Sequence, residues 1–119
     1  MKNWTVRFRV VDKDRFDEVK SGRKKYETRA ATVKYQPMSV GDTITFVCGE
    51  ARFKKRIVKK HHFKTAAAML KKLPLRRVMP DAGIKTLADV KARYATYPDY
   101  PEKIKRYGLF AFELAVCCS

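Results

Sequence analysis

Hydrophobic and polar residues alternate at the beginning of the chain. Trp4, Val6, Phe8 and Val10 are each separated by a single polar residue. A period of two places such residues on one face of a β-strand. We therefore predict a first strand over residues 4–10 whose apolar face is buried.

A short helix is predicted after this strand. Asp12 or Asp14 can cap its beginning, and Phe16 and Val19 have the spacing of one helix face. Gly22 can end the helix, because glycine adopts the left-handed conformation that other residues avoid.

Later segments predict further strands and three helices. Alternating and β-branched residues predict strands over 25–31, 43–48, 51–62 and 109–117, with a hairpin tip at residues 49–50. Thr65 and Thr86 can each cap a helix, and Pro101 fits the first turn of another. About five strands with helices inserted late indicate an α+β fold. We predict a single domain over residues 1–119, built as a small, mostly antiparallel β-barrel with short inserted helices.

The charge balance is strongly positive. The 119 residues include 28 Lys and Arg against 12 Asp and Glu, a formal net charge of +16. Such an excess repels itself in a compact fold, so we expect a polyanionic partner. No stretch approaches the ~20 apolar residues that span a bilayer, and the cations are not gathered on one amphipathic helix. RNA or a nucleotide is the expected partner and a membrane is not; the alternative is a basic surface with no specific partner.

Cysteine and histidine patterns indicate neither a metal site nor a cofactor. Cys48, Cys117 and Cys118 lack the C-x-x-C spacing of zinc and redox motifs. We predict reduced thiols in a cytoplasmic protein and do not favour a redox role for the C-terminal pair. His61 and His62 are adjacent on a predicted strand and have no acidic or cysteine neighbours in the sequence, so packing or a basic patch is favoured over metal binding.

Candidate binding chemistry concentrates between Gly22 and Arg29. Lys24 follows the predicted helix end, while Glu27 and Arg29 are two residues apart on a strand and share a face. Arg29 can bind a phosphate or a base edge with its planar fork. Glu27 can accept a hydrogen bond from an exocyclic amine or hold Arg29 in place. The alternative is a solvated strand face with a weak ion pair.

Aromatic and basic residues elsewhere suggest nucleic-acid contacts. Tyr97 and Tyr100 flank a proline in a predicted loop among cations, which suits base stacking; Tyr94 is predicted to pack in the core. Clustered cations are candidates for phosphate contacts, although solvated strand faces look the same in sequence. They are Arg52, Lys54, Lys55, Arg56, Arg76 and Arg77.

Three motifs, in this order along the chain, resemble the ASCH domain of the PUA-like superfamily. They are G-x-K-x-x-E-x-R over residues 22–29, V-G-D-x-I-x-F over 40–46, and Y-P-E-x-x-x-x-Y-G-L-x-A-F-E-L over 100–114. The resemblance covers nearly the whole chain. It implies a PUA-like β-barrel with a cleft lined by Lys24, Glu27 and Arg29, and RNA or a nucleotide as ligand.

Members of that family differ in activity. Some resemble plain RNA-binding modules, others are described as ribonucleases, and a short bacterial relative is an amidohydrolase of N4-acetylcytidine that uses a lysine, a threonine and a glutamate. Lys24 falls on that lysine, but Glu27 occupies the threonine position, and residues 79–82 (M-P-D-A) offer no clear counterpart of the glutamate. This departure counts against the same mechanism.

Two main functions are therefore predicted. The first is an RNA-binding domain that uses its basic surface and the Lys24, Glu27 and Arg29 cleft. The alternative is a hydrolase acting on RNA or on a modified nucleoside such as an acylated cytidine, with Lys24 and Glu27 as catalytic residues. A module that binds acidic proteins is a third, more distant interpretation, and no obligate protein partner is inferred.

Overall fold

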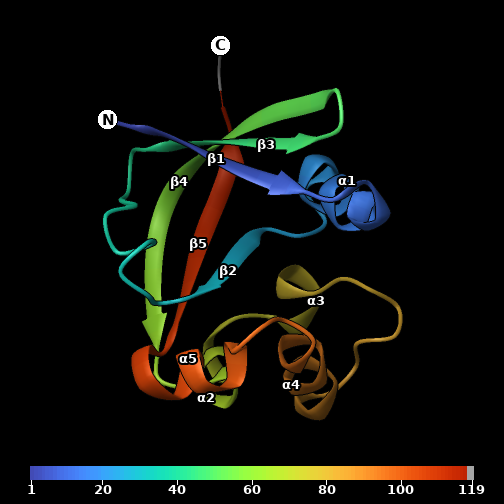
Figure 1. The fold of residues 1–119 in the computed structure, drawn as a ribbon, viewed down its shortest axis with the longest axis vertical. Coiled ribbons are helices and arrows are strands. Elements are labelled where there is room, and N and C mark those ends of the chain that lie inside the picture. The colour runs from blue at the N-terminus through green and yellow to red at the C-terminus, as the bar shows by residue number, and fades with distance from the viewer. Residues whose placement is uncertain (118–119) are drawn as a thin grey trace.

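A curled five-stranded sheet forms the framework of residues 1–117, the part of the chain that the computed structural model describes (Figure 1). The strand order is β1-β3-β4-β5-β2. β1 pairs with β3 in parallel, and the other neighbouring strands pair antiparallel. The sheet is a half-barrel with β1 and β2 at its two edges. Its strands are β1 (Asn3–Phe8), β2 (Tyr26–Ala30), β3 (Thr43–Cys48), β4 (Ala51–Phe63) and β5 (Leu109–Val116).

The helices lie in two places along the chain, which confirms the predicted mixed α+β fold with late helices. A 3-10 helix, η1 (Val10–Asp12), and α1 (Lys13–Ser21) connect β1 to β2. The others are inserted between β4 and β5, namely α2 (Ala66–Lys72), α3 (Leu75–Val78), α4 (Leu87–Ala95) and α5 (Tyr100–Tyr107). Thr65 and Thr86 cap α2 and α4 with their side chains, as predicted. No helix in the described residues is long and apolar enough to cross a bilayer.

Two hydrophobic clusters share the strand β5. Phe110, Phe112 and Leu114 belong to the cluster that also contains Phe16 of α1, whereas Leu109 and Ala111 belong to a second cluster. Because successive side chains of a strand point to opposite faces, the two clusters lie on opposite faces of the sheet. The second cluster contains Met69 of α2, Val78 of α3, and Val90 and Tyr94 of α4. The inserted helices therefore cover the face of β5 that α1 does not.

The first strand is shorter than predicted. It ends at Phe8, and Val10 belongs to η1, where its side chain is 70% exposed. A turn forms because the backbone N–H of Asp12 donates to the carbonyl of Arg9 at 2.9 Å. The prediction that Val10 continues the buried face was wrong, because this turn breaks the alternation.

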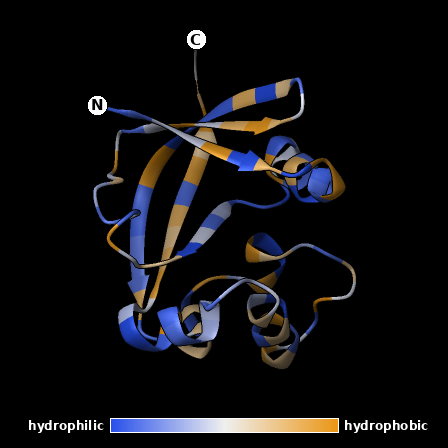
Figure 2. Ribbon diagram, in the orientation of Figure 1, coloured by the Kyte–Doolittle hydropathy of each residue, from blue (hydrophilic) through white to orange (hydrophobic). Residues whose placement is uncertain are grey.

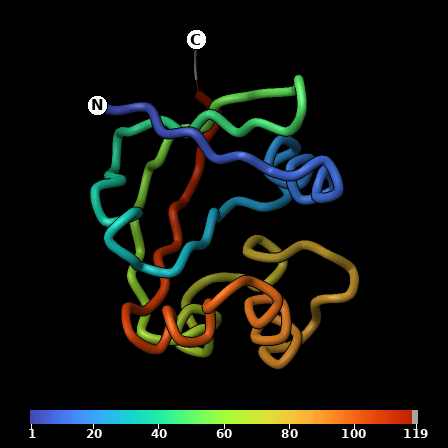
Figure 3. The backbone as a smooth tube through the Cα atoms, viewed as in Figure 1, coloured from blue at the N-terminus to red at the C-terminus, as the bar shows by residue number. Residues whose placement is uncertain are grey.

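The V-G-D motif of residues 40–42 has a structural role. The Asp42 carboxylate accepts hydrogen bonds from the Trp4 indole at 2.9 Å and from the backbone N–H groups of Lys2 and Ser39 at 3.0 and 3.1 Å. It thereby fixes β1 to the end of the long connection between β2 and β3. This connection runs along one side of the half-barrel (Figure 3).

The cysteines form no disulfide within residues 1–117. Cys48 is buried and its thiol lies 3.7 Å from the carbonyl of Arg9, while Cys117 is partly exposed. Cys118, the other member of the C-terminal pair, lies outside the described residues.

Candidate functional site

A cavity of about 540 Å³ lies between the half-barrel and the inserted helices. Its walls come from the end of β1, from η1 and α1, from β2, and from the segments around α3, α4 and α5. The size is typical of sites for small molecules. Lys24, Glu27, Arg29, Tyr97 and Tyr100, which sequence reasoning selected as a binding cleft, all line this one cavity.

The end of α1 sets the position of Lys24. Gly22 ends the helix at φ 86°, in the left-handed region, and the chain then turns into β2. The backbone N–H of Lys24 donates to the carbonyl of Glu18 at 3.0 Å. The Lys24 ammonium crosses to the helical side and donates to the carbonyl of Val78 in α3 at 2.8 Å. Lys24 thus bridges the sheet and the helices.

The charge state of Lys24 is perturbed. Burial lowers its pKa from the ordinary value, because the interior disfavours a charged ammonium. Arg29 and Arg93 lower it further by repulsion, while Glu27 and Glu18 oppose the shift. The net direction is downward, toward the uncharged amine.

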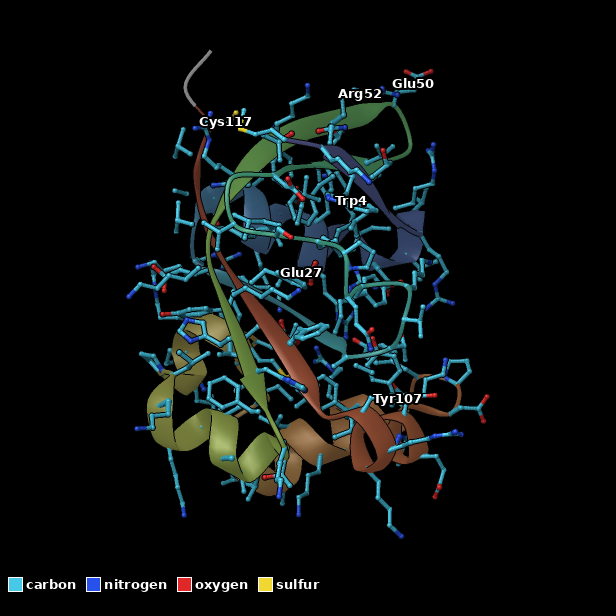
Figure 4. All side chains as sticks on the ribbon, turned by 90° about the vertical axis from the view of Figure 1, so that its left-hand side faces the viewer. Trp4, Glu27, Glu50, Arg52, Tyr107 and Cys117 are labelled. Atoms are coloured by element: carbon cyan, nitrogen blue, oxygen red, sulfur yellow. The ribbon has the colours of Figure 1, made fainter. Side chains whose placement is uncertain are left out.

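Glu27 and Arg29 form a largely buried pair, in which Arg29 is the more exposed partner. Glu27 is 5% exposed, and its Oε2 lies 3.6 Å from Nη2 of Arg29. Arg29 also donates weakly to the hydroxyl of Tyr35 at 3.4 Å and lies over that ring at 5.5 Å. Burial alone would lower the pKa of Arg29, but Glu27, Tyr35 and Tyr100 outweigh it and the pKa is raised. These side chains do not form a solvated strand face, and Figure 4 shows Glu27 near the middle of the molecule.

Hydrogen bonding within this pair is incomplete. Glu27 Oε2 and Arg29 Nε are buried atoms, and neither has a hydrogen-bond partner among residues 1–117. An unpaired buried polar group costs about 1–3 kcal/mol, and more when it is charged. Two neighbouring side chains of the cavity lining therefore carry an unused acceptor and an unused donor.

Three tyrosines form an aromatic wall. Tyr94 is 3% exposed, as predicted for a core residue, and its hydroxyl lies 2.7 Å from the hydroxyl of Thr28. The ring of Tyr100 lies 6.0 Å from Tyr94 and 5.2 Å from Tyr97 between centroids. Tyr97 lies in a loop, as predicted, but Tyr100 is the first residue of α5. Its hydroxyl accepts a long hydrogen bond of 3.4 Å from the N–H of Ala30.

Glu18 is a cavity residue that sequence reasoning missed. It lies on α1, is 6% exposed and lines the cavity beside Lys24. Burial and a hydrogen bond with Asp81 raise its pKa to about 7, although Lys24 and Arg23 oppose the shift. The same hydrogen bond and Arg93 lower the pKa of Asp81 to about 2. No local signal marks Glu18, because its partner Asp81 lies far along the chain.

Four further arginines line the cavity, and the predicted binding cleft did not include them. They are Arg7, Arg9, Arg15 and Arg93. Asp12 pairs with Arg9 at 2.9 Å and with Arg15 at 3.2 Å, and Arg93 pairs with Asp81. With Lys24 and Arg29 the lining has six cationic side chains against three acidic ones, so its overall charge favours an anionic ligand.

The cations predicted to contact phosphate lie outside this cavity. Arg76 donates to the carbonyls of Pro80, Asp81 and Ile84, so it holds the loop after α3. Arg77 is exposed on α3. Lys55 is paired in register with the buried Ile44 and shares its face of the sheet. Arg52, Lys54 and Arg56 alternate with Lys55 along β4, so they lie on the other face. The structure thus divides the predicted set into separate groups.

The two histidines make packing contacts. His62 Nε2 lies 2.9 Å from the carbonyl of Tyr107, and its ring packs against Phe110. His61 stacks on Phe63 and lies 3.7 Å from the Glu113 carboxylate. Residues 1–117 contain no group of three or more potential metal ligands.

Comparisons with known proteins identify similar folds but no family. No family profile and no curated protein matches the chain. The crystal structure of hypothetical protein PH0355 is 27% identical, with a TM-score of 0.76 over 96% of this chain and 97% of that one. The solution structure of protein PF0455 from Pyrococcus furiosus is 26% identical, with a TM-score of 0.72 over 94% of each chain. The chain shares the α+β half-barrel fold of these proteins, and neither name states a function.

Proposed function

We propose that the chain is an RNA-binding domain of the ASCH type, with a PUA-like fold, and that its cavity holds one nucleotide of the RNA. The unpaired atoms of Glu27 and Arg29 carry this proposal. A ligand with an N–H donor and a neighbouring acceptor would satisfy both atoms and remove the cost of leaving them unpaired. Nucleobase edges present such adjacent donors and acceptors.

The rest of the lining suits the other parts of a nucleotide. Tyr97 and Tyr100 offer aromatic surface against which a base can stack. The arginines of the lining offer charge-assisted hydrogen bonds to a phosphate. The net charge of +16 would steer a polyanion toward the molecule at low salt.

The test measures binding of short labelled single-stranded RNAs of different base composition by fluorescence anisotropy. Arg29→Ala is expected to weaken binding about tenfold or more and to change which RNA is preferred, since one charged hydrogen-bonding partner is worth roughly 1.5–3 kcal/mol. Arg106→Ala is the matched control, because Arg106 is an exposed arginine on α5 that contacts Tyr107. Melting curves confirm that each variant is folded. If Arg29→Ala binds every RNA as tightly as the parent, the cavity is not the binding site.

A second candidate function is hydrolysis of RNA or of an acylated nucleoside. It is favoured by one observation: Lys24, whose pKa is lowered by burial, lines the same cavity as Glu18, whose pKa is raised to about 7. A lysine nearer its neutral form can act as a base or nucleophile, and a carboxyl group that titrates near neutral pH can carry a proton.

Incubation of the purified protein with labelled RNA and with acylated cytidines distinguishes the two functions. Products that form with the parent and disappear in Lys24→Ala would support the hydrolase. Lys24→Arg keeps a cation at this position but holds it protonated, so it is expected to be inactive as well if Lys24 acts as the neutral amine. Binding without products in any of these proteins supports the RNA-binding domain.

A further inference from the structure

The outer face of β1, β3 and β4 presents a basic surface that is distinct from the cavity. Strand pairing aligns its side chains in three rows across the strands. Hydrogen bonds from the hydroxyls of Thr43 and Thr45 to the Asn3 side chain, at 2.7 and 3.2 Å, show that these residues share one face. We call this surface the threonine–arginine face; its rows are Asn3, Thr43 and Arg56, then Thr5, Thr45 and Lys54, then Arg7, Val47 and Arg52.

The positive charges of this face are not neutralised by acidic side chains of its own strands. The sequences of β1, β3 and β4 contain no Asp or Glu. Within residues 1–117, Arg7, Arg52, Lys54 and Arg56 take part in no ion pair. The nearest acidic residues in sequence are Glu50, at the β3–β4 turn, and two whose carboxylates are already engaged: Asp42 accepts three hydrogen bonds, and Asp12 pairs with Arg9 and Arg15. Figure 4 shows Arg52 and Glu50 at the end of the molecule opposite the inserted helices α2–α5.

The aromatic residues of β1, of β3 and of the part of β4 around Arg52, Lys54 and Arg56 are on the other side of the sheet, whereas Phe63 at the far end of β4 packs against the inserted helices. Trp4, Phe8, Phe46 and Phe53 belong to or pack against the cluster around Phe16. Figure 2 shows hydrophobic and hydrophilic residues alternating along the half of β4 near the β3–β4 turn. Thr45 and Val47 at the centre of this part of the sheet are buried, so the groups that the outer face offers are mainly the cations of β1 and β4 and the exposed Asn3 and Thr5. Such groups contact phosphate and sugar, and this part of the face offers no ring on which an unpaired base could stack.

We infer that the threonine–arginine face binds the phosphate backbone of a double-helical RNA segment adjoining the nucleotide in the cavity. A duplex exposes phosphates while its base faces stay stacked, which matches a face with cations and no rings. Arg52, Lys54 and Arg56 extend over about 14 Å of strand, and β1 lies about 10 Å from β4, so several phosphates fall within reach. Arg7 belongs to this face and also lines the cavity, so the two surfaces are continuous. The identity of the polymer rests on the proposed function.

The experiment removes two charges from the face and, separately, two charges from elsewhere. The variant is Arg52→Gln with Lys54→Gln, and the control is Lys71→Gln with Lys72→Gln, which lie exposed at the end of α2. Binding of a labelled RNA hairpin is measured over a series of NaCl concentrations. The face variant is expected to reduce the slope of log K against log salt by roughly 1–2, because each phosphate contact contributes about 0.9. The control is expected to change the slope by less than half of that.

Several results would overturn the inference. Equal effects of the two double variants would mean that only total charge matters. A face variant that keeps the parental slope for the hairpin but no longer binds vesicles containing phosphatidylserine would assign the face to a membrane surface instead. A face variant that weakens single-stranded RNA more than the hairpin would contradict the duplex.

The two proposals fail in different ways. If Arg29→Ala leaves RNA preference and affinity unchanged while the face variant still lowers the hairpin slope, the cavity proposal fails and the face stands. If Arg29→Ala changes the preference while both double variants act alike, the face fails and the cavity stands. Arg7 is left unchanged in these variants because it belongs to both surfaces.

Discussion

The Glu18 carboxyl group shares a hydrogen bond with that of Asp81, and this contact joins α1 to the loop between α3 and α4. Two carboxyl groups can make such a bond only while one of them holds a proton. Glu18 holds that proton, because burial and the neighbouring carboxylate raise its pKa to about 7. Asp81 stays ionised because its ion pair with Arg93 stabilises the carboxylate. A residue of the cavity wall, Glu18, is therefore connected to the loop between α3 and α4 by a contact that titrates near neutral pH.

Thermal stability is expected to fall between about pH 4.5 and pH 7 because of this pair. The pKa of Glu18 in the folded state lies above its ordinary value of 4.5. Its stabilising contribution is therefore complete below pH 4.5 and is lost as pH rises through about 7. A series of melting temperatures at constant ionic strength measures the fall.

Glu18→Gln removes the titration and keeps a hydrogen-bond donor toward Asp81. Its melting temperature is expected to be nearly constant over the same pH interval and to exceed that of the parent by a few degrees at pH 8. Asp17→Asn on the same helix is the control, because Asp17 forms a partly exposed ion pair with Lys13 and should leave the fall in place. A parent protein with the same melting temperature at pH 5 and pH 7.5 would contradict the assignment of the proton.

Local signals were sufficient for most of the fold. Thr65 and Thr86 mark the beginnings of α2 and α4, and Gly22 marks the end of α1, because capping depends on residues that are close in sequence. The short helix α3 was missed, since Pro74 was interpreted only as the end of the preceding helix, whereas it stands immediately before the new one. The division of the sheet between two hydrophobic clusters depends on long-range packing that no short motif encodes.

Part of the cavity was predictable because some of its residues are close together in the sequence. Lys24, Glu27 and Arg29 come from one segment, so a bend followed by an alternating strand was enough to place them together. Glu18 and Asp81 acquire their properties from each other across the fold. Such pairs cannot be found from spacing, and the arginines of the lining are indistinguishable in sequence from any other surface cations.

Acid stability is expected to depend on Asp42. Hydrogen bonds from Trp4, from the backbone of Lys2 and from that of Ser39 lower the pKa of Asp42 to about 2. Its contribution is present above the ordinary value of 3.8 and is lost as pH falls through about 2. Asp42→Asn should lower the melting temperature at pH 7 by several degrees and have much less effect near pH 2.

The fluorescence of Trp4 reports on this contact directly, because it is the only tryptophan of the chain. Glu50→Gln at the exposed β3–β4 turn is the control and should leave the acid transition unchanged. An Asp42→Asn protein that loses as much stability at pH 2 as at pH 7 would show that the ionised carboxylate is not the stabilising form.

Alanine substitution at three glycines is expected to change the free energy of unfolding by different amounts, which depend on backbone strain and on the space available for a Cβ. Gly108 joins α5 to β5 at φ 85° and ψ −165°, a region used almost only by glycine. A Cβ there would lie 2.5 Å from the carbonyl oxygen of Phe63 and 2.9 Å from Nε2 of His62. Gly108→Ala should therefore destabilise by about 3 kcal/mol or more, since the strain alone costs about 1–3 kcal/mol.

Gly22→Ala, at a positive φ in open space, should cost about 1 kcal/mol. Gly83→Ala, with neither strain nor a neighbour within 4 Å, should be neutral or stabilise by about 0.4–1 kcal/mol. Urea unfolding measures all three free energies, and a Gly108→Ala protein no less stable than Gly22→Ala would contradict the close approach of β4 to the end of α5.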